Sequence, residues 1–172
     1  DGQPTVPDYA SAPGDARGWR GSSFVPGAVI GDVWLVEKTL GKGGMGSVYR
    51  CHNRHAPRIL AAIKLLDPAF QYHPEAKARF LREAEILYTI DPPNVVKVSN
   101  VPPDAQPPYL EMEFVDGLSL EDELAQFGPI PFEVALDRAK QPASALRSLP
   151  RKNIFHRDIK PDNILLCRSI DG

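Results

Sequence analysis

The segment Gly41–Val48 constrains the possible folds more than any other part of the sequence. It places four glycines in eight residues and fits the pattern G-x-G-x-x-G-x-V, which occurs in two unrelated kinds of phosphate-binding loop. In a dinucleotide-binding fold, a helix follows the glycines directly so that its N-terminus faces the pyrophosphate. Here the residues that follow, 47–51, favour a strand. We therefore expect a glycine loop between two antiparallel strands that could close over a triphosphate, with an ordinary glycine-rich hairpin as the alternative.

Apolar segments of two kinds surround this loop. Short ones rich in Val, Ile, Leu and aromatic residues are typical of strands, whereas others repeat apolar residues at helical spacing. Pro142 falls inside the last helical segment, where a proline costs about 3 kcal/mol, so we expect a kink or an interruption there. The expected strands are 32–40, 47–52, 60–66, 95–101 and 109–115, and the expected helices are 74–91, 118–127 and 131–149.

The order of these elements predicts an α+β chain with three parts. Residues 1–26 are rich in Pro, Gly and Ser without a periodic apolar pattern, so we expect a disordered linker. Residues 27–115 would form a small antiparallel sheet with one helix, and residues 116–172 the first part of a helical second lobe.

The overall composition excludes several classes of protein. The chain is 42% hydrophobic and 24% charged, which are globular proportions, and its net charge of −2 gives no field that would hold a nucleic acid. Because no run of 18 apolar residues occurs, we expect no membrane segment in this chain. Two cysteines cannot form a disulfide scaffold, which favours a reducing, cytoplasmic location. The chain begins at Asp1, and we expect an excised or incomplete sequence.

Lys64 is surrounded by apolar neighbours in the third expected strand. An ammonium group in such surroundings needs a partner of opposite charge. In the helix that follows, Glu83 has Phe80 and Leu87 one turn away on either side, which favours it as that partner, with Glu85 as the second choice. The alternative is a lysine that extends to solvent and a solvated helix acid.

The densest group of functional side chains lies at residues 156–163. Between two apolar runs the chain has the pattern H-R-D-x-K-x-x-N, which contains more charged and hydrogen-bonding side chains than a turn requires. This order fits a positioned base, a phosphate-binding cation and a metal ligand in one loop. A solvated polar turn is the alternative.

These three motifs, in this order, resemble those of the eukaryotic-type protein kinases. The sequences Gly-Gly-Met-Gly and His-Arg-Asp-Ile-Lys-Pro are most similar to the bacterial serine/threonine branch, and the resemblance covers about residues 30–172. It implies a kinase-like fold, with residues 27–115 as the ATP-binding lobe. It also implies phosphoryl transfer from ATP, with Mg²⁺, to Ser or Thr of a protein substrate. Lysine two places after the Asp of the loop resembles the serine/threonine class rather than the tyrosine class.

The resemblance implies a role for each motif residue. Asp158 would accept the proton of the substrate hydroxyl, Lys160 would neutralise charge on the transferred group, and Asn163 would hold one Mg²⁺. Lys64, positioned by Glu83, would hold the α- and β-phosphates. The other expected ATP contacts are Gly41, Gly43 and Gly46 over the phosphates, Leu40, Val48, Ala62, Met112 and Leu165 around the adenine ring, and the backbone of Glu113 and Val115 at its edge.

The sequence also departs from the family pattern. No Asp-Phe-Gly occurs in the 172 residues, so we expect a fragment that ends before that metal-binding segment, and the chain alone is expected to be inactive. Pro142 is unusual for the helix that supports the catalytic loop. A catalytically silent nucleotide-binding or adaptor module is therefore the alternative function. A metal site at Cys51, His52 and His55 is not favoured, because a fourth ligand is not nearby in the sequence.

Overall fold

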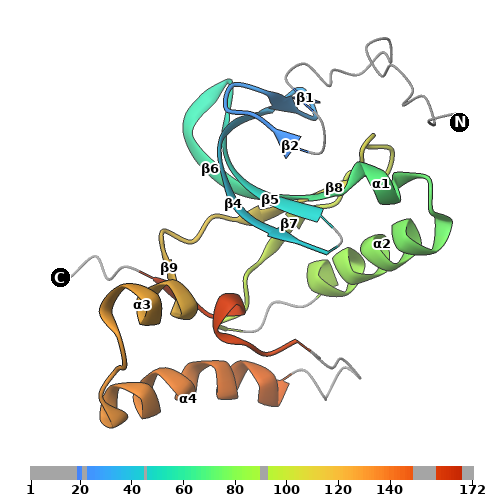
Figure 1. Ribbon diagram of the computed structural model, residues 1–172. Coiled ribbons are helices and arrows are strands. Elements are labelled where there is room, and N and C mark those ends of the chain that lie inside the picture. The colour runs from blue at the N-terminus through green and yellow to red at the C-terminus, as the bar shows by residue number, and fades with distance from the viewer. Residues whose placement is uncertain (1–18, 21–22, 45, 90–92, 149–157, 168–172) are drawn as a thin grey trace, which may run out of the picture.

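The computed structural model describes residues 19–20, 23–44, 46–89, 93–148 and 158–167 (Figure 1). Most of the predicted linker, residues 1–18 and 21–22, lies outside these ranges. The described residues form a curled sheet with helices beside it and a smaller helical part that follows in the chain, so the predicted α+β class is confirmed. Within the described ranges, none of the helices combines the length and apolar character needed to cross a bilayer.

Six strands form the main sheet, and every neighbouring pair in it is antiparallel. The predicted strands at 32–40, 47–52, 60–66 and 109–115 are present, but the fourth expected strand, 95–101, is reduced to three residues. Asn94 adopts a left-handed turn conformation with φ 64°, which delays the start of pairing. In spatial order the strands are β3 (Val29–Ile30), β4 (Trp34–Gly43), β5 (Gly46–Asn53), β6 (Ala56–Leu66), β8 (Tyr109–Glu113) and β7 (Val98–Asn100).

One face of the sheet packs against helix α2 (Pro74–Thr89), which follows the short helix α1 (Pro68–Gln71). The side chain of Asp67 caps α1 by accepting a hydrogen bond of 2.8 Å from the Ala69 N–H. Phe80 and Ala84 of α2 are fully buried against Leu66 and Leu110 of the sheet. This packing fixes α2 beside β6, the strand that carries Lys64.

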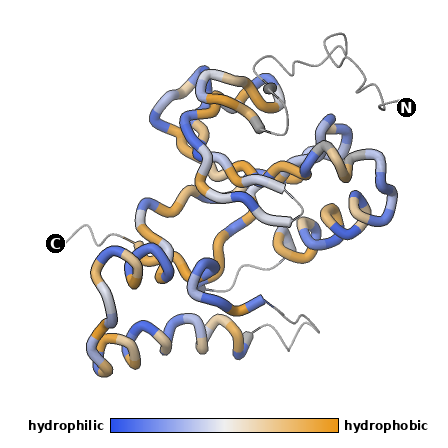
Figure 2. The backbone as a smooth tube through the Cα atoms, in the orientation of Figure 1, coloured by the Kyte–Doolittle hydropathy of each residue, from blue (hydrophilic) through white to orange (hydrophobic). Residues whose placement is uncertain are grey.

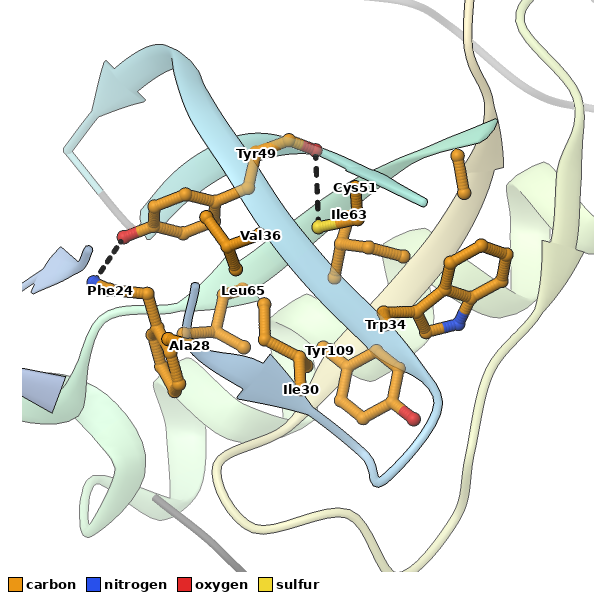
Figure 3. Packing of buried hydrophobic residues seen from close by; sticks show 11 residues of the cluster. Phe24, Ala28, Ile30, Trp34, Val36, Tyr49, Cys51, Ile63, Leu65 and Tyr109 are labelled. Carbon is orange, nitrogen blue, oxygen red and sulfur yellow. Dashed lines mark hydrogen bonds between the residues drawn. The ribbon is translucent and has the colours of Figure 1, made fainter. Parts of the chain in front are cut away.

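The other face of the sheet is covered by the residues that precede β4, including part of a short hairpin, β1 (Trp19–Arg20) and β2 (Ser23–Phe24). Phe24 is 4% exposed, its ring meets Tyr49 edge-on at 6.0 Å, and its N–H donates a 3.1 Å hydrogen bond to the Tyr49 hydroxyl (Figure 3). The expected linker boundary at residue 26 is therefore wrong for Phe24. A single aromatic in a Pro- and Gly-rich segment gives no periodic signal, yet it fills the core.

The C-terminal part contains strand β9 (Gly117–Ser119), helices α3 (Leu120–Phe127) and α4 (Phe132–Ser148), a 3-10 turn η2 (Pro161–Asn163) and strand β10 (Leu165–Cys167). The helix expected from residue 118 starts at Leu120, because Leu118 and Ser119 pair with β10 and Ser119 caps α3 through its Oγ. Helix α4 continues through Pro142 without an interruption. Hydrophobic and hydrophilic positions alternate along α3 and α4 (Figure 2).

Candidate active site

Lys64 and Glu83 are in contact. The Lys64 Nζ donates a 2.7 Å hydrogen bond to Glu83 Oε1, which joins the C-terminal end of β6 to the middle of α2. Their side chains are 28% and 45% exposed, so the pair is partly open to solvent and not enclosed by apolar neighbours as the sequence predicted. An ion pair this exposed contributes only about 0–1 kcal/mol to stability, so its main effect is to fix the position of the ammonium group.

Asp158, Lys160 and Asn163 converge within one loop. Asn163 Nδ2 donates to the backbone oxygen of Asp158 at 2.8 Å and to its carboxylate Oδ2 at 2.9 Å. The ammonium group of Lys160 lies 3.6 Å from the same Oδ2. One carboxylate oxygen is thus held by two groups, which orients the carboxylate and leaves Oδ1 as a possible acceptor for a proton.

The backbone around this loop is anchored to the rest of the C-terminal part. The Asn163 N–H donates to the Lys160 carbonyl at 3.0 Å within η2, and the Leu120 N–H donates to the Ile164 carbonyl at 2.8 Å. Strand β10 follows directly and pairs with β9. The start of α3 and the loop at residues 158–163 are therefore positioned together, whereas residues 149–157, which include His156 and Arg157, lie outside the described ranges.

The glycine motif lies in the β4–β5 hairpin, where Gly43 pairs with Gly46. The glycines differ in their surroundings. A Cβ on Gly41 or Gly44 would meet open space, so these residues leave the outer surface of the loop free. A Cβ on Gly46 would clash with the Leu65 carbonyl, so Gly46 is required by the close approach of β5 to β6 whatever else it does. Met45 lies outside the described residues.

The residues expected around an adenine ring occupy two regions. Ala62 and Met112 are directly opposite each other on β6 and β8, and Val48 is opposite Lys64 on the adjacent strand pair. Leu40 of β4 is 44% exposed and Leu165 of β10 is 45% exposed. Exposed apolar side chains suit contact with a planar aromatic ring, although core packing also explains the buried Ala62.

Backbone groups of Glu113 and Val115 were expected at the adenine edge. The Glu113 N–H already donates to the Lys97 carbonyl at 2.9 Å, and its Oε1 accepts from the Lys97 N–H at 2.8 Å. Only the carbonyl oxygen of Glu113, which has a second lone pair, is then suited to a ligand. Val115 follows in the connection between β8 and β9.

The chemistry of the donor set fits a magnesium nucleotide. Because the Nδ2 atom of Asn163 is used in hydrogen bonds to Asp158, its Oδ1 atom is the group left for a cation. Mg²⁺ prefers oxygen ligands and takes several of them from phosphates and water. Among the described residues, the structure has no group of three or more acidic, His or Cys side chains arranged for a metal. Cys51 points into the core cluster, whereas His52 contacts Glu37.

Comparison with known proteins decides the family. The model of the protein kinase domain matches residues 34–170. The chain belongs to the protein kinase domain family. A probable serine/threonine-protein kinase of Clostridium perfringens is 35% identical over 140 residues, which cover 81% of this chain and 20% of that protein. The probable serine/threonine-protein kinase PknB of Lactococcus lactis is 34% identical over 143 residues, which cover 83% of this chain and 23% of that protein.

Solved kinase structures agree with this assignment. The PknI kinase domain of Mycobacterium tuberculosis superimposes with a TM-score of 0.66 at 26% identity, covering 84% of this chain and 59% of that domain. The Rad53 structure in complex with AMP-PNP gives a TM-score of 0.68 at 26% identity, covering 81% of this chain and 36% of that one. The chain spans about a fifth of the length of the curated relatives it matches. The predicted kinase-like fold and serine/threonine kinase resemblance are confirmed.

One group of residues was not predicted from the sequence. Glu37 forms an ion pair with Arg50 and a hydrogen bond with His52, and Arg50 also lies over the ring of Phe114 in the connection that follows β8. Glu37 alternates with the buried Val36 along β4, so it lies on the face that Arg50 and His52 occupy on β5. The contact of Arg50 with Phe114 joins distant segments and cannot be read from the strand pattern, although an arginine at an alternating position of β5 was a signal that this face carries charge.

Proposed function

We propose that the protein acts as a kinase that transfers the γ-phosphoryl group of MgATP to Ser or Thr residues of proteins. The observation that carries the proposal is the convergence of Lys160 and Asn163 on the carboxylate of Asp158. This arrangement combines a base held in one orientation with a neighbouring cation. The names of the relatives, which are serine/threonine-protein kinases, support the choice of substrate class.

In the proposed reaction, the chain's own residues position the reactants. Asp158 accepts the proton of the substrate hydroxyl as the oxygen attacks the γ-phosphorus, and the bond from that phosphorus to the bridging oxygen of the β-phosphate breaks so that ADP leaves. Lys160 offsets negative charge on the transferred group. Lys64, held by Glu83, binds the α- and β-phosphates. When bound, Mg²⁺ supplies Lewis-acid stabilisation of the phosphate oxygens, and Asn163 is one of the residues that would hold it.

The proposed nucleotide site lies between the two parts of the chain. Gly41 and Gly43 would cover the phosphates, and Gly46 would place the loop by its contact with β6. Val48, Ala62, Met112, Leu40 and Leu165 would contact the adenine ring, with the carbonyl of Glu113 and the N–H of Val115 at its edge. Because ATP is supplied in the cytoplasm, the reaction would take place there.

Two substitutions in the full-length protein test this proposal. Lys64→Met should remove the phosphate contact and Asp158→Asn the proton acceptor, and each should lower phosphoryl transfer by at least about 100-fold. The measurement is transfer of labelled γ-phosphate from ATP to generic Ser/Thr substrates. Lys140→Met and Asp137→Asn are matched controls, because these residues form an exposed ion pair on α4 and should leave transfer unchanged.

The alternative function, a catalytically silent nucleotide-binding or adaptor module, predicts the opposite result for phosphoryl transfer. The unmutated full-length protein would then show no transfer with any generic substrate, and binding to partner proteins would persist in the Asp158→Asn variant. That pair of results would overturn the proposed enzymatic function. Transfer that survives Asp158→Asn would also contradict the assigned role of the carboxylate.

A further inference from the structure

A cluster of four side chains lies beside the proposed adenine site, at the end of the sheet next to the β8–β9 connection. The Glu37 carboxylate contacts Arg50 Nε through Oε2 at 2.7 Å and His52 Nδ1 through Oε1 at 2.8 Å. The guanidinium carbon of Arg50 lies 4.7 Å from the centre of the Phe114 ring. Phe114 is the residue between Glu113 and Val115, whose backbone groups are proposed to bind adenine.

The strand pattern explains why Arg50 can reach Phe114. Alternate residues of β5 share a face, so Arg50 lies on the same face as Val48 and away from the buried Tyr49 and Cys51. Across the sheet, Arg50 is opposite Ala62, and Ala62 is opposite Met112, two residues before Phe114. Because Ala62 has a small side chain, it leaves room for the long arginine side chain to extend over β6 towards the connection.

Glu37 restricts the position of Arg50 from the opposite side. The side chains of Glu37 and Arg50 are 32% and 31% exposed, which keeps much of the contact out of water. The Arg50 Nε–H does not point at a hydrogen-bond acceptor, so the contact with the Glu37 carboxylate is an attraction between charges and not a directed hydrogen bond. Arg50 is therefore held between a negative charge and the electron-rich face of an aromatic ring.

We propose that Arg50 is a positioning residue for nucleotide binding, with Glu37 as its support. By holding the Phe114 ring, Arg50 fixes the backbone on both sides of it, so the Glu113 carbonyl and the Val115 N–H are ordered before the adenine arrives. Pre-ordering of this kind lowers the entropy cost of binding. The inference rests on the proposed function, because it assigns a purpose to the cluster only if adenine binds at this connection.

The first experiment measures binding of MgATP and of adenosine to the full-length protein and to its Arg50→Met variant. Loss of an arginine–aromatic contact corresponds to a weakening of about three- to thirtyfold. We expect the dissociation constants of both ligands to rise by the same factor, because the effect is on the adenine contact and not on the phosphates. KM for ATP should rise by a similar factor while kcat changes by less than about twofold.

Two further variants make the result specific. Arg50→Lys keeps a cation that can contact the ring and should recover part of the lost affinity. Glu37→Gln should weaken binding in the same direction as Arg50→Met, and by less. Arg58→Met is the matched control, because Arg58 is an exposed arginine on β6 and its loss changes the net charge identically without affecting nucleotide binding.

The inference is overturned if the unmutated protein binds adenosine and the Arg50→Met variant binds it equally well, or if the variant loses kcat with an unchanged KM. If the unmutated protein binds neither ligand, the proposed function fails and the positioning role fails with it. A double-mutant cycle of Arg50→Met and Phe114→Leu in urea unfolding then reports on the contact alone. If the losses of unfolding free energy are non-additive, the contact between Arg50 and Phe114 stabilises the fold only. If they are additive, the contact has no energetic effect either.

Discussion

The two parts of the chain on either side of the Phe114–Asp116 connection bury their apolar residues very differently. In the sheet part, both faces are covered, and Phe80 of α2 is 1% exposed. In the C-terminal part, Phe132 of α4 is 75% exposed and Phe127 of α3 is 68% exposed. Among the described residues that follow Leu110, only Ala145 is buried.

This difference means that the two halves of the candidate site are positioned by different forces. Lys64 and Glu83 are carried by a strand and a helix that pack through a shared apolar core. Asp158 and Asn163 are held mainly by local hydrogen bonds and by the short β9–β10 pairing. The ammonium side of the site should therefore be rigid, whereas the carboxylate side should respond to changes in solvent and to local substitutions.

The largest expected contrast is between the two cysteines. Burial, helped by the negative charge of Glu37, raises the pKa of Cys51 from 9.0 to about 12, so at pH 8 its thiolate fraction should be about a thousandfold below that of an ordinary thiol. Cys167 in β10 is exposed. Alkylation by iodoacetamide, followed by mass spectrometry, should modify Cys167 in the native protein and Cys51 only after unfolding. Equal rates would show that the sheet opens as readily as the C-terminal part.

The same substitution in the two parts gives the next contrast. Phe80→Ala should lower the free energy of unfolding by about 3–5 kcal/mol, because it leaves a cavity between α2 and the sheet. Phe132→Ala should change it by less than about 0.5 kcal/mol, because that ring faces solvent. Urea denaturation of the 172-residue chain measures both. A large loss from Phe132→Ala would indicate that the ring is covered in solution.

A smaller effect is expected at Pro142, and it shows whether the proline or the exposed apolar residues make the C-terminal part less stable. Pro142 removes one backbone hydrogen bond inside α4, and Pro142→Ala should stabilise this helix locally by up to about 3 kcal/mol. Hydrogen exchange should then slow in α4 and stay unchanged in β5 and β6. If the α4 amides became as protected as those of β5, the proline and not the exposed apolar face would explain the contrast between the parts.

The sequence predicted the sheet well, because its strands and the helix that covers it carry regular patterns. It also predicted the contact between Lys64 and Glu83, although for an incomplete reason, since both side chains are partly exposed. The loop residues could be assigned together because they are close in the sequence. The roles assigned to these residues stay predictions until nucleotide binding and transfer are measured.

Other features could not be predicted because they depend on contacts between distant residues. The apolar run at residues 164–167 predicts a strand, but its expected partner was a segment that follows it in the chain. It pairs instead with β9, where Gly117–Ser119 has no strand pattern, so that Cys167 lies opposite Gly117. The Arg50 cluster depends on the pairing of β4 with β5 and on the contact of Arg50 with Phe114 in the connection after β8. The continuity of α4 through Pro142 shows that a helix can tolerate the loss of one bond when its neighbours remain helical.

The buried position of Phe24 has a practical consequence for anyone who wants a shorter version of this protein. The match to the kinase family begins at residue 34, and a natural choice would be to start the chain there. Such a start would delete Phe24, Ala28 and Ile30, three members of the core on the outer face of the sheet. The Tyr49 hydroxyl would lose its donor and its ring would lose the neighbour that covers it. The smallest piece that keeps the sheet intact therefore starts about ten residues before the boundary of the family match.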